Sequence, residues 1–413
     1  MIPPLREVQP EVAAQLEETG YLAALLIDLG ALAQVERTFG EAAFRSLREQ
    51  VDPLLEELQD HFRREDRIAR DDSQVDRFLM FLSGPRRREQ GLRVDDLRRA
   101  VERVEYFLSP RVGRLAHAYL RERPALRVGY GIVLWSPLEG VPRQMARLVD
   151  DAAACAELRS RNHERHERER LMEIVQNREI WAAYQPIVAI PDGRTMGWEA
   201  LARGPRGTDL ESPAALFSRA ARFGILEELE RTCRRRAFLD WPVLRGPGRL
   251  FVNTVPATIR DPSFQGRGIL DYLGPDLSPN SVTLEITERT VIENLSLYRE
   301  SMHAFTDLGF SFAIDDVGAG YSGLETVAAL RPAYLKIDIA LVRDIHLKKI
   351  SQQVVRAILD MSRGLGATVI AEGIQVKEEA DALSELGVGW GQGYYFSRPV
   401  DPHAPRPAAA PAS

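Results

Sequence analysis

Residues 311–320 read SFAIDDVGAG, an apolar run that ends in two adjacent acids, Asp315 and Asp316. The run Phe312–Ile314 has the composition of a buried strand. Two carboxylates at the end of such a strand would lose hydration and repel each other. The pair therefore needs either a partner of opposite charge or a chemical role.

Seven further short apolar runs recur through the C-terminal half. They are YQPIVAI near Tyr184, MGWEALAR near Trp198, RLFVNT near Val252, SVTLEIT near Leu284, AYLKID near Leu335, ATVIAEG near Ile370 and GQGYYF near Tyr394. Segments with helical periodicity lie between them, and one has Ser212 as its predicted N-cap and Pro213 at its first helical position. Strands that alternate with helices predict an α/β fold with a parallel sheet, and eight such units predict a (β/α)8 barrel of the TIM type.

Nearly every run carries a polar side chain at or just after its last apolar residues. These side chains belong to Glu199, Asn253, Glu285, Asp315, Asp316, Lys336, Glu372 and Gln392. A lone acid there is often a helix N-cap, and a lone lysine is usually a surface residue. In a parallel barrel, however, all these positions meet at the C-terminal mouth, where active sites lie. Carboxylate and amide oxygens suit Mg²⁺ or Mn²⁺, and adjacent aspartates can bridge two such ions.

The bulk composition limits the class of protein. A length of 413 residues predicts two domains, and a net charge of −6 argues against sequence-independent binding to nucleic acid. The two cysteines, Cys155 and Cys233, exclude a disulfide framework and fit a reducing compartment. Neither a membrane-spanning run nor a signal-peptide pattern is evident, so we expect a cytoplasmic protein.

A charged segment separates the two predicted domains. Residues 158–170 read LRSRNHERHERER, without Gly or Pro and with mixed charges at helical spacing. We expect a helix from about Arg143 to Gln176, within which residues 159–170 form a solvated linker. Residues 171–400 then form the barrel, and the Pro/Ala-rich residues 401–413 a disordered tail.

The barrel segment resembles the EAL family. Glu199, Ala200 and Leu201 form the EAL triplet, which Arg203 extends to ExLxR. YQPI, FVNT, LEITE, DDVGAGYSG, LKID, AEGI and QGYYFSRP lie around it in the family's order, from about residue 171 to 399. The resemblance implies a barrel with an irregular first strand that hydrolyses the bacterial second messenger cyclic di-GMP to linear pGpG. It also implies two divalent cations, Mg²⁺ or Mn²⁺.

Residue roles follow from the resemblance position by position. The implied metal ligands are Glu199, Asn253, Glu285, Asp315 and Asp316. The implied catalytic residues are Glu199, Lys336 near the attacking water, Glu372 as general base, and Glu288 as an anchor for the loop after the paired aspartates. The implied substrate-binding residues are Gln185, Arg203, which suits a phosphate, and Gln392.

Two positions in that loop depart from the pattern of active members. Val317 stands where Phe is usual, and Gly323 where Ser is usual. In the family this loop couples the metal site to dimerisation of the barrel, so we expect a homodimer whose loop could be looser. The alternative is a receptor that binds cyclic di-GMP without cleaving it and signals through a protein partner. Such receptors usually lose metal ligands, which this chain keeps, so hydrolysis is the preferred prediction.

The N-terminal half resembles the GGDEF fold, a smaller α/β sandwich, and we assign residues 1–158 to it. The opening strand and helix (from Leu25), the approach to the signature hairpin (from Phe62) and a late strand (from Val128) carry this resemblance. Where GGDEF should stand, after Arg70, the chain reads DDSQVDRF, without the two glycines that let the backbone approach a phosphate.

Other nucleotide contacts of the GGDEF family are also absent. Gly30 replaces the second metal-binding acid, which leaves Asp28 without partners for a metal, and Glu36 stands where an Asn would contact guanine. We therefore expect a catalytically inactive, regulatory domain. Arg63 and Asp66 have the RxxD spacing of the family's product-inhibition site, although the end of a charged helix would show the same letters.

Overall fold

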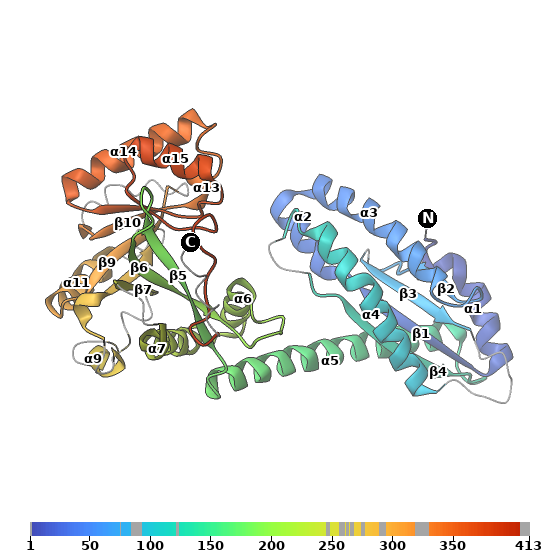
Figure 1. Cartoon of the computed structure of the whole chain (residues 1–413). Coiled ribbons are helices and arrows are strands. Elements are labelled where there is room, and N and C mark those ends of the chain that lie inside the picture. The colour runs from blue at the N-terminus through green and yellow to red at the C-terminus, as the bar shows by residue number, and fades with distance from the viewer. Residues whose placement is uncertain are drawn as a thin grey trace, which may run out of the picture. The chain divides into compact units, whose positions relative to one another are not determined.

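Two compact units divide the chain, Met1–Glu167 and Arg168–Ser413 (Figure 1). The computed structural model describes residues 2–74, 76–83, 93–120, 124–244, 248–255, 261, 264, 268–273, 277–288, 295–318 and 330–404. None of the helices in these ranges combines the length and apolar character that a membrane crossing requires.

The N-terminal unit is an antiparallel sheet with helices on both faces. Its strands are β1 (Tyr21–Asp28), β2 (Arg67–Arg70), β3 (Arg77–Leu82) and β4 (Arg127–Leu134), in the order β2-β3-β1-β4. Its helices are α1 (Leu5–Thr19), α2 (Ala33–Phe39), α3 (Glu41–Asp60), α4 (Val94–Ala116) and the first part of α5 (Val141–Gln176). Alternate residues of β1 pack against α3 and α4 on one face, and against α1 and α5 on the other. Because both faces are covered, β1 is apolar almost throughout.

The C-terminal unit contains a closed barrel in the order β10-β11-β12-β5-β6-β7-β8-β9. The strands are β5 (Trp181–Ala189), β6 (Thr195–Arg203), β7 (Arg249–Asn253), β8 (Val282–Thr287), β9 (Ser311–Val317), β10 (Tyr334–Ile337), β11 (Thr368–Ala371) and β12 (Trp390–Gly391). The helices around them are α6 (Pro213–Phe223), α7 (Leu226–Leu244), α9 (Gly268–Leu273), α11 (Leu295–Asp307), α13 (Ile339–Val342), α14 (Lys349–Leu365) and α15 (Lys377–Leu386). Strand β5 is antiparallel to both of its neighbours, and the other pairs are parallel. The predicted barrel and its irregular first strand are confirmed.

The eighth strand is not where the aromatic run predicted it. Strand β12 is only Trp390–Gly391, whereas Tyr394 lies in the turn that follows and is 57% exposed. The backbone after Trp390 passes so close to Ile374 that residues without a Cβ are required there. A Cβ at Gly393 would lie 2.0 Å from the backbone oxygen of Ile374, so only glycine allows this close approach.

Glycine also divides the long helical segment that the periodicity predicted after Ser212. Gly224 takes a left-handed conformation (φ 68°), so α6 ends there and α7 begins two residues later. Pro213 is the first residue of α6, as predicted, but the Ser212 side chain makes no capping hydrogen bond. The position is therefore set by the proline rather than by a side-chain cap.

Helix α5 and the end of the chain fit the predicted organisation in part. Helix α5 begins two residues before the predicted Arg143 and ends at Gln176. In the predicted tail, Asp401 pairs with Arg206, and His403 Nε2 lies 3.0 Å from Asp240 Oδ1. Residues 405–413 lie outside the described residues.

A buried acid on α7 gives the barrel unit a predicted pH dependence. Burial raises the pKa of Glu230 from 4.5 to about 7, although Arg234 lowers it in part. Between these two values the folded chain holds more protons than the unfolded chain, so stability falls as pH rises from about 4.5 to 7. We expect Glu230→Gln to reduce the change in free energy of unfolding over this range by up to about 3 kcal/mol.

Chemical denaturation of both proteins at pH 5 and pH 8 measures this effect. Glu228→Gln, an exposed change on the same helix at a residue that does not contribute to the shifted pKa of Glu230, is the matched control and should leave the pH dependence as it is. An unchanged pH dependence in Glu230→Gln would show that Glu230 is ionised in both states.

Candidate active site

A buried lysine lies at the centre of the predicted acidic cluster. The side chain of Lys336, on β10, is 0% exposed. Its Nζ lies 2.5 Å from Glu372 Oε1, 2.7 Å from Glu285 Oε1, 3.3 Å from Glu199 Oε2 and 3.4 Å from Asp315 Oδ1. These groups come from β6, β8 and β9 and from the residue after β11. The structure thus brings together side chains spread over more than 170 positions of the sequence.

An irregularity in β9 explains how two adjacent acids reach one site. Leu335 pairs with Ile314 and Ile337 pairs with Val317, so two steps on β10 face three on β9. Asp316 lies in this bulge with a left-handed backbone (φ 58°), and its N–H donates to Asp315 Oδ1 at 3.0 Å. In a regular strand neighbouring side chains point to opposite faces, whereas a bulge redirects one of them.

The bulge makes a compact oxygen site possible. Asp315, Asp316 and Glu372 each offer a carboxylate oxygen, and these three atoms lie within 4.8 Å of one another. A cation could therefore contact all three side chains. Of the two adjacent acids, Asp315 thus lies against a group of opposite charge, Lys336. Both acids also belong to the shared oxygen site.

Amide side chains hold Glu199 in place. Asn253 Nδ2 donates to its Oε1 at 3.1 Å, and Gln392 Nε2 donates to its Oε2 at 2.7 Å. Gln392 Nε2 also donates to Gln185 Oε1 at 3.0 Å, and Gln185 Nε2 donates to the backbone oxygen of Ser397 at 2.9 Å. Burial opposes ionisation of Glu199, but the Lys336 ammonium and these amide donors lower its pKa.

The other acids are less well compensated. Burial raises the pKa of Glu285, Asp315 and Glu372, and neighbouring carboxylates raise it further. Burial and Asp315 raise the pKa of Asp316 to about 6. Apart from the Lys336 ammonium 2.7 Å from its Oε1, Glu285 has no polar partner among the described residues, although its side chain is fully buried. One ammonium faces several carboxylates, so the donor set fits additional cations.

Glu288 and Val317 lie beside the loop that follows the paired aspartates. Glu288 is buried, and its Oε2 accepts a hydrogen bond from the N–H of Gly318 at 3.2 Å. This contact fits the predicted role of Glu288 as an anchor. Val317 is fully buried in the barrel core, whereas residues 319–329, with Gly323, lie outside the described residues.

Arg203 ends β6 at the mouth of the barrel. It pairs in register with Trp181, and its Nη1 donates to the backbone oxygen of Ala202 at 2.9 Å. Burial lowers its pKa, while Tyr394, Glu211 and Glu199 raise it. A half-buried guanidinium at the mouth suits a phosphate.

The sequence analysis missed Asp338. Its carboxylate accepts from the N–H of Ala340 at 2.7 Å at the start of α13, and its charge contributes to the raised pKa of Asp316. The LKID motif contained the signal, because Asp338 follows Lys336 by two positions at the same strand end.

The RxxD pair of the N-terminal unit is engaged in the fold. Asp66 is buried, and its Oδ1 accepts from the N–H and the hydroxyl of Ser83 at 2.6 and 2.7 Å. Its Oδ2 accepts from the N–H of Arg63 at 2.9 Å. These contacts favour a structural role for Asp66 over a ligand site.

Asp28, the remaining acid of the expected metal loop, is also engaged. Its Oδ1 accepts from the N–H of Gly30 at 2.7 Å, and its Oδ2 lies 3.5 Å from Arg77 Nε. A metal at Asp28 would have to displace this guanidinium.

Comparisons with known proteins place the barrel unit in a family. The EAL domain model matches residues 168–399. PdeB, a cyclic di-GMP phosphodiesterase of Shewanella oneidensis, is 29% identical over 56% of this chain and 28% of its own length. An uncharacterized signaling protein of Caulobacter vibrioides is 30% identical over 55% of this chain and 28% of its own. The chain thus spans less than a third of these two relatives.

A third relative extends into the N-terminal unit. An uncharacterized protein of Mycobacterium tuberculosis is 26% identical over 94% of this chain and 63% of its own length. The EAL domain match, by contrast, covers only the barrel unit, so the likeness of residues 1–158 to GGDEF domains stays a prediction.

Solved structures share the fold. The cAMP-bound EAL enzyme Bd1971 aligns with a TM-score of 0.53 and 25% identity over 68% of this chain and 82% of its own. The PaMucR phosphodiesterase in complex with c-di-GMP aligns with a TM-score of 0.50 and 24% identity over 56% of this chain and 96% of its own. Since the family model covers more than half of the sequence, the chain belongs to the EAL domain family.

Proposed function

We propose that this chain is a cytoplasmic, metal-dependent phosphodiesterase that hydrolyses cyclic di-GMP to linear pGpG. The observation that carries the proposal is the buried cluster around Lys336, in which the acids outnumber the ammonium at the mouth of an EAL barrel. The printed names of relatives support the substrate, since PdeB is called a cyclic di-GMP phosphodiesterase and the PaMucR structure is a c-di-GMP complex.

The proposed metal ligands are Glu199, Asn253, Glu285, Asp315 and Asp316. Two divalent cations held there would lower the pKa of bound water and neutralise charge on the phosphodiester. Asn253 and Gln392 fix the orientation of Glu199 through their hydrogen bonds. Glu372, against Lys336, would accept a proton from the attacking water, and Lys336 would stabilise negative charge that develops nearby. Arg203 and Gln185 would orient the substrate.

Residues 1–158 would regulate this activity as a GGDEF-like domain without cyclase activity, joined through residues 159–170. Its α/β layers support this assignment, and the match to the Mycobacterium tuberculosis relative extends over both units. The engaged carboxylates of Asp28 and Asp66 support the loss of nucleotide chemistry.

A cleavage assay tests the proposed function. Purified protein is incubated with cyclic di-GMP and Mg²⁺ or Mn²⁺, and products are separated by chromatography. We expect pGpG, and none when EDTA removes the metal. Saturable binding without product would instead identify a receptor, and Val317 would then be the first position to change to Phe.

Dimerisation through the barrel is part of the proposal. Leu347, Ile350 and Val354 form an exposed apolar stripe beside and along α14, with Leu347 and Ile350 74% and 78% exposed. Helix α14 also lies beside Gly318, which follows the paired aspartates, because a Cβ there would contact Ile358 on the buried side of that helix. Large exposed apolar side chains that cluster in this way mark interfaces.

We expect Ile350→Glu to convert a dimer to a monomer, because the charge would be buried in the interface. Light scattering coupled to size-exclusion chromatography measures the mass. Glu385→Ala, an exposed change on α15, is the control. A wild-type chain that is monomeric at micromolar concentration would contradict this part of the proposal.

A further inference from the structure

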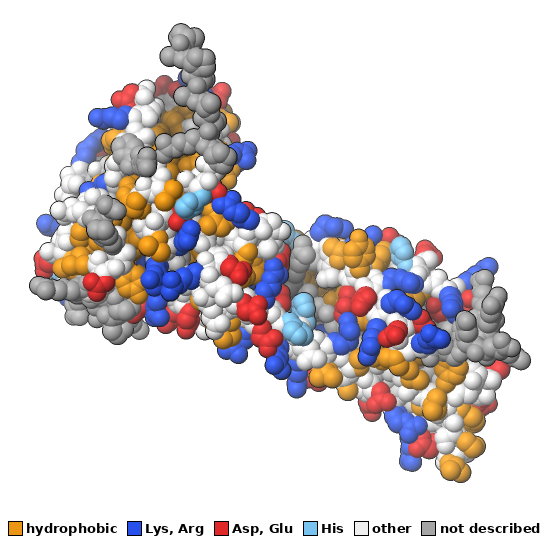
Figure 2. All heavy atoms as spheres, turned by 60° about the horizontal axis from the view of Figure 1, so that its bottom comes forward, with side chains coloured by type: hydrophobic (Ala, Val, Ile, Leu, Met, Phe, Trp, Pro, Cys, Tyr) orange, Lys and Arg blue, Asp and Glu red, His pale blue; other side chains and the backbone are white. Residues whose placement is uncertain are grey.

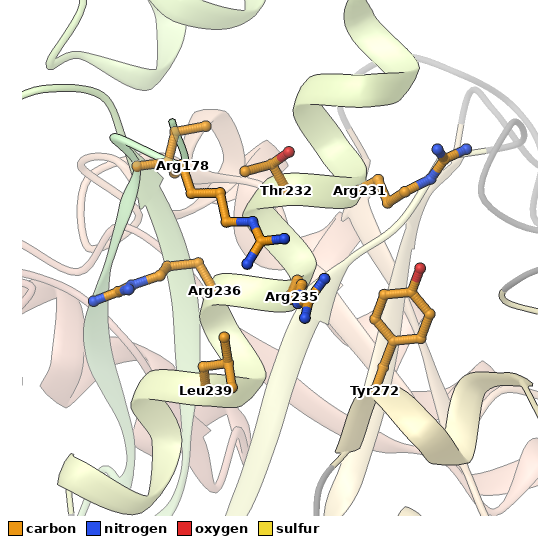
Figure 3. A pocket seen from close by; sticks show the side chains of 8 residues that line it. Arg178, Arg231, Thr232, Arg235, Arg236, Leu239 and Tyr272 are labelled. Carbon is orange, nitrogen blue, oxygen red and sulfur yellow. The ribbon is translucent and has the colours of Figure 1, made fainter. Parts of the chain in front are cut away.

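A second candidate site lies on the outer side of the barrel unit, where the residues just before β5 meet α7 and α9. A cavity of about 270 Å³ is lined by four arginines, Arg178, Arg231, Arg235 and Arg236, together with Leu239 and Tyr272 on its apolar side. We call it the α7 arginine pocket. Basic side chains gather on the face of the barrel unit that carries α7 (Figure 2), and Figure 3 shows Arg178 extending toward Arg235.

Two of the four guanidinium groups have carboxylate partners. Arg231 Nε lies 2.9 Å from Asp261 Oδ2, and Arg236 Nε lies 2.7 Å from Asp240 Oδ2. Arg178 and Arg235 make no ion pair with any residue that the structure describes. The nearby Glu179 accepts a hydrogen bond from Asn177 instead. The pocket therefore keeps two cations that no described acid balances.

Charge repulsion and backbone strain both oppose this arrangement of arginines. Arg231 and Arg235 stand one helical turn apart on α7, where like charges repel. Arg178 follows α5 with a left-handed backbone (φ 57°), and its N–H donates to the oxygen of Val175. Glycine is the usual residue at this position because it carries no Cβ. A strained arginine aimed at a second unpaired arginine points to an anion between them.

We propose that the α7 arginine pocket binds the phosphate chain of a nucleoside triphosphate. Arg178 and Arg235 offer planar, fork-shaped donors that match phosphate oxygens. The volume is close to the lower end of the range for small-molecule sites, about 300 Å³. It suits a phosphate chain, with the base placed along Leu239 and the Tyr272 ring. The site is independent of the proposed hydrolysis, since none of its residues belongs to the cluster around Lys336.

Isothermal titration calorimetry on the full chain tests the proposal, with inorganic pyrophosphate, ATP and GTP as probes at near-physiological salt. Arg178→Gly and Arg235→Gln should each weaken binding by about tenfold to a hundredfold. Glycine suits the left-handed position, so Arg178→Gly should keep or raise the unfolding temperature while it removes the charge. This variant separates loss of a ligand contact from loss of folding.

Arg363→Gln, on the exposed side of α14, is the matched control and should bind like the wild type. Equal affinity for pyrophosphate and the triphosphates would support recognition of phosphate alone, and tighter binding of ATP or GTP would add a contact to the base. Absence of saturable binding for all three probes would overturn the proposal. Binding that survives in both Arg178→Gly and Arg235→Gln would do the same, because the anion would then lie elsewhere.

Discussion

Glu199→Ala is expected to lower the rate of metal-dependent cyclic di-GMP cleavage on the order of 10³-fold or more. The Glu199 carboxylate interacts with three side chains of the site. It accepts hydrogen bonds from Asn253 and Gln392 and lies 3.3 Å from Lys336 Nζ. Alanine would remove a proposed metal ligand and the acceptor of Asn253, and would leave Gln392 with Gln185 as its remaining acceptor, so the loss should appear in kcat.

Chromatographic separation of cyclic di-GMP and pGpG at saturating substrate gives the rate. Glu378→Ala, an exposed acid on α15, is the control and should react at the wild-type rate. Calorimetry with cyclic di-GMP, run alongside, separates lost binding from lost chemistry. Cleavage at more than a tenth of the wild-type rate in Glu199→Ala would contradict the assignment of Glu199 as a metal ligand.

The second large effect concerns stability as well as activity. Lys336→Met keeps the length of the side chain but removes the ammonium that lies against Glu199, Glu285, Asp315 and Glu372. In the presence of EDTA we expect the free energy of unfolding to fall by about 3–5 kcal/mol, because buried carboxylates are left without their partner. Cleavage should also be lost.

Urea denaturation measures this change, and titration with Mn²⁺ gives a second result. A bound divalent cation would replace the lost positive charge, so Mn²⁺ should stabilise Lys336→Met more than it stabilises the wild type. Lys348→Met, in an exposed pair with Asp344, is the control and should change stability little. Equal stabilisation of both proteins by Mn²⁺ would show that the cation and Lys336 do not share the same carboxylates.

Much of the barrel could be predicted from the sequence because most of its apolar runs have an acidic, amide or lysine side chain at or near their ends. Glu285 and Lys336 each follow a short apolar run, and the parallel arrangement of those runs is enough to bring them together. The position of β12 could not be predicted in this way. Its two residues are fixed by the approach of Gly391 and Gly393 to Ile374, a tertiary contact that leaves no periodic pattern.

Backbone geometry accounts for the other misses. The bulge at Asp315 and Asp316 depends on the left-handed backbone of Asp316, and two adjacent aspartates in a sequence do not predict that conformation. The α7 arginine pocket joins Arg178 to residues of α7 and α9 that lie more than 50 positions away, and no motif links them. By contrast, the RxxD spacing of Arg63 and Asp66 was visible, but only the contacts with Ser83 show that the acid is engaged.

The reversed direction of β5 has a consequence for how an upstream segment could influence the chemistry. In an all-parallel barrel the first strand would begin at the end opposite the mouth. Here its first residue, Trp181, is the register partner of Arg203, the last residue of β6. Helix α5 ends at Gln176, five positions before Trp181, so only a few peptide units separate this helix from the mouth of the barrel along the chain. A sensor domain fused ahead of residue 168 would therefore be joined, through the end of α5, to the strand that begins at the mouth of the barrel.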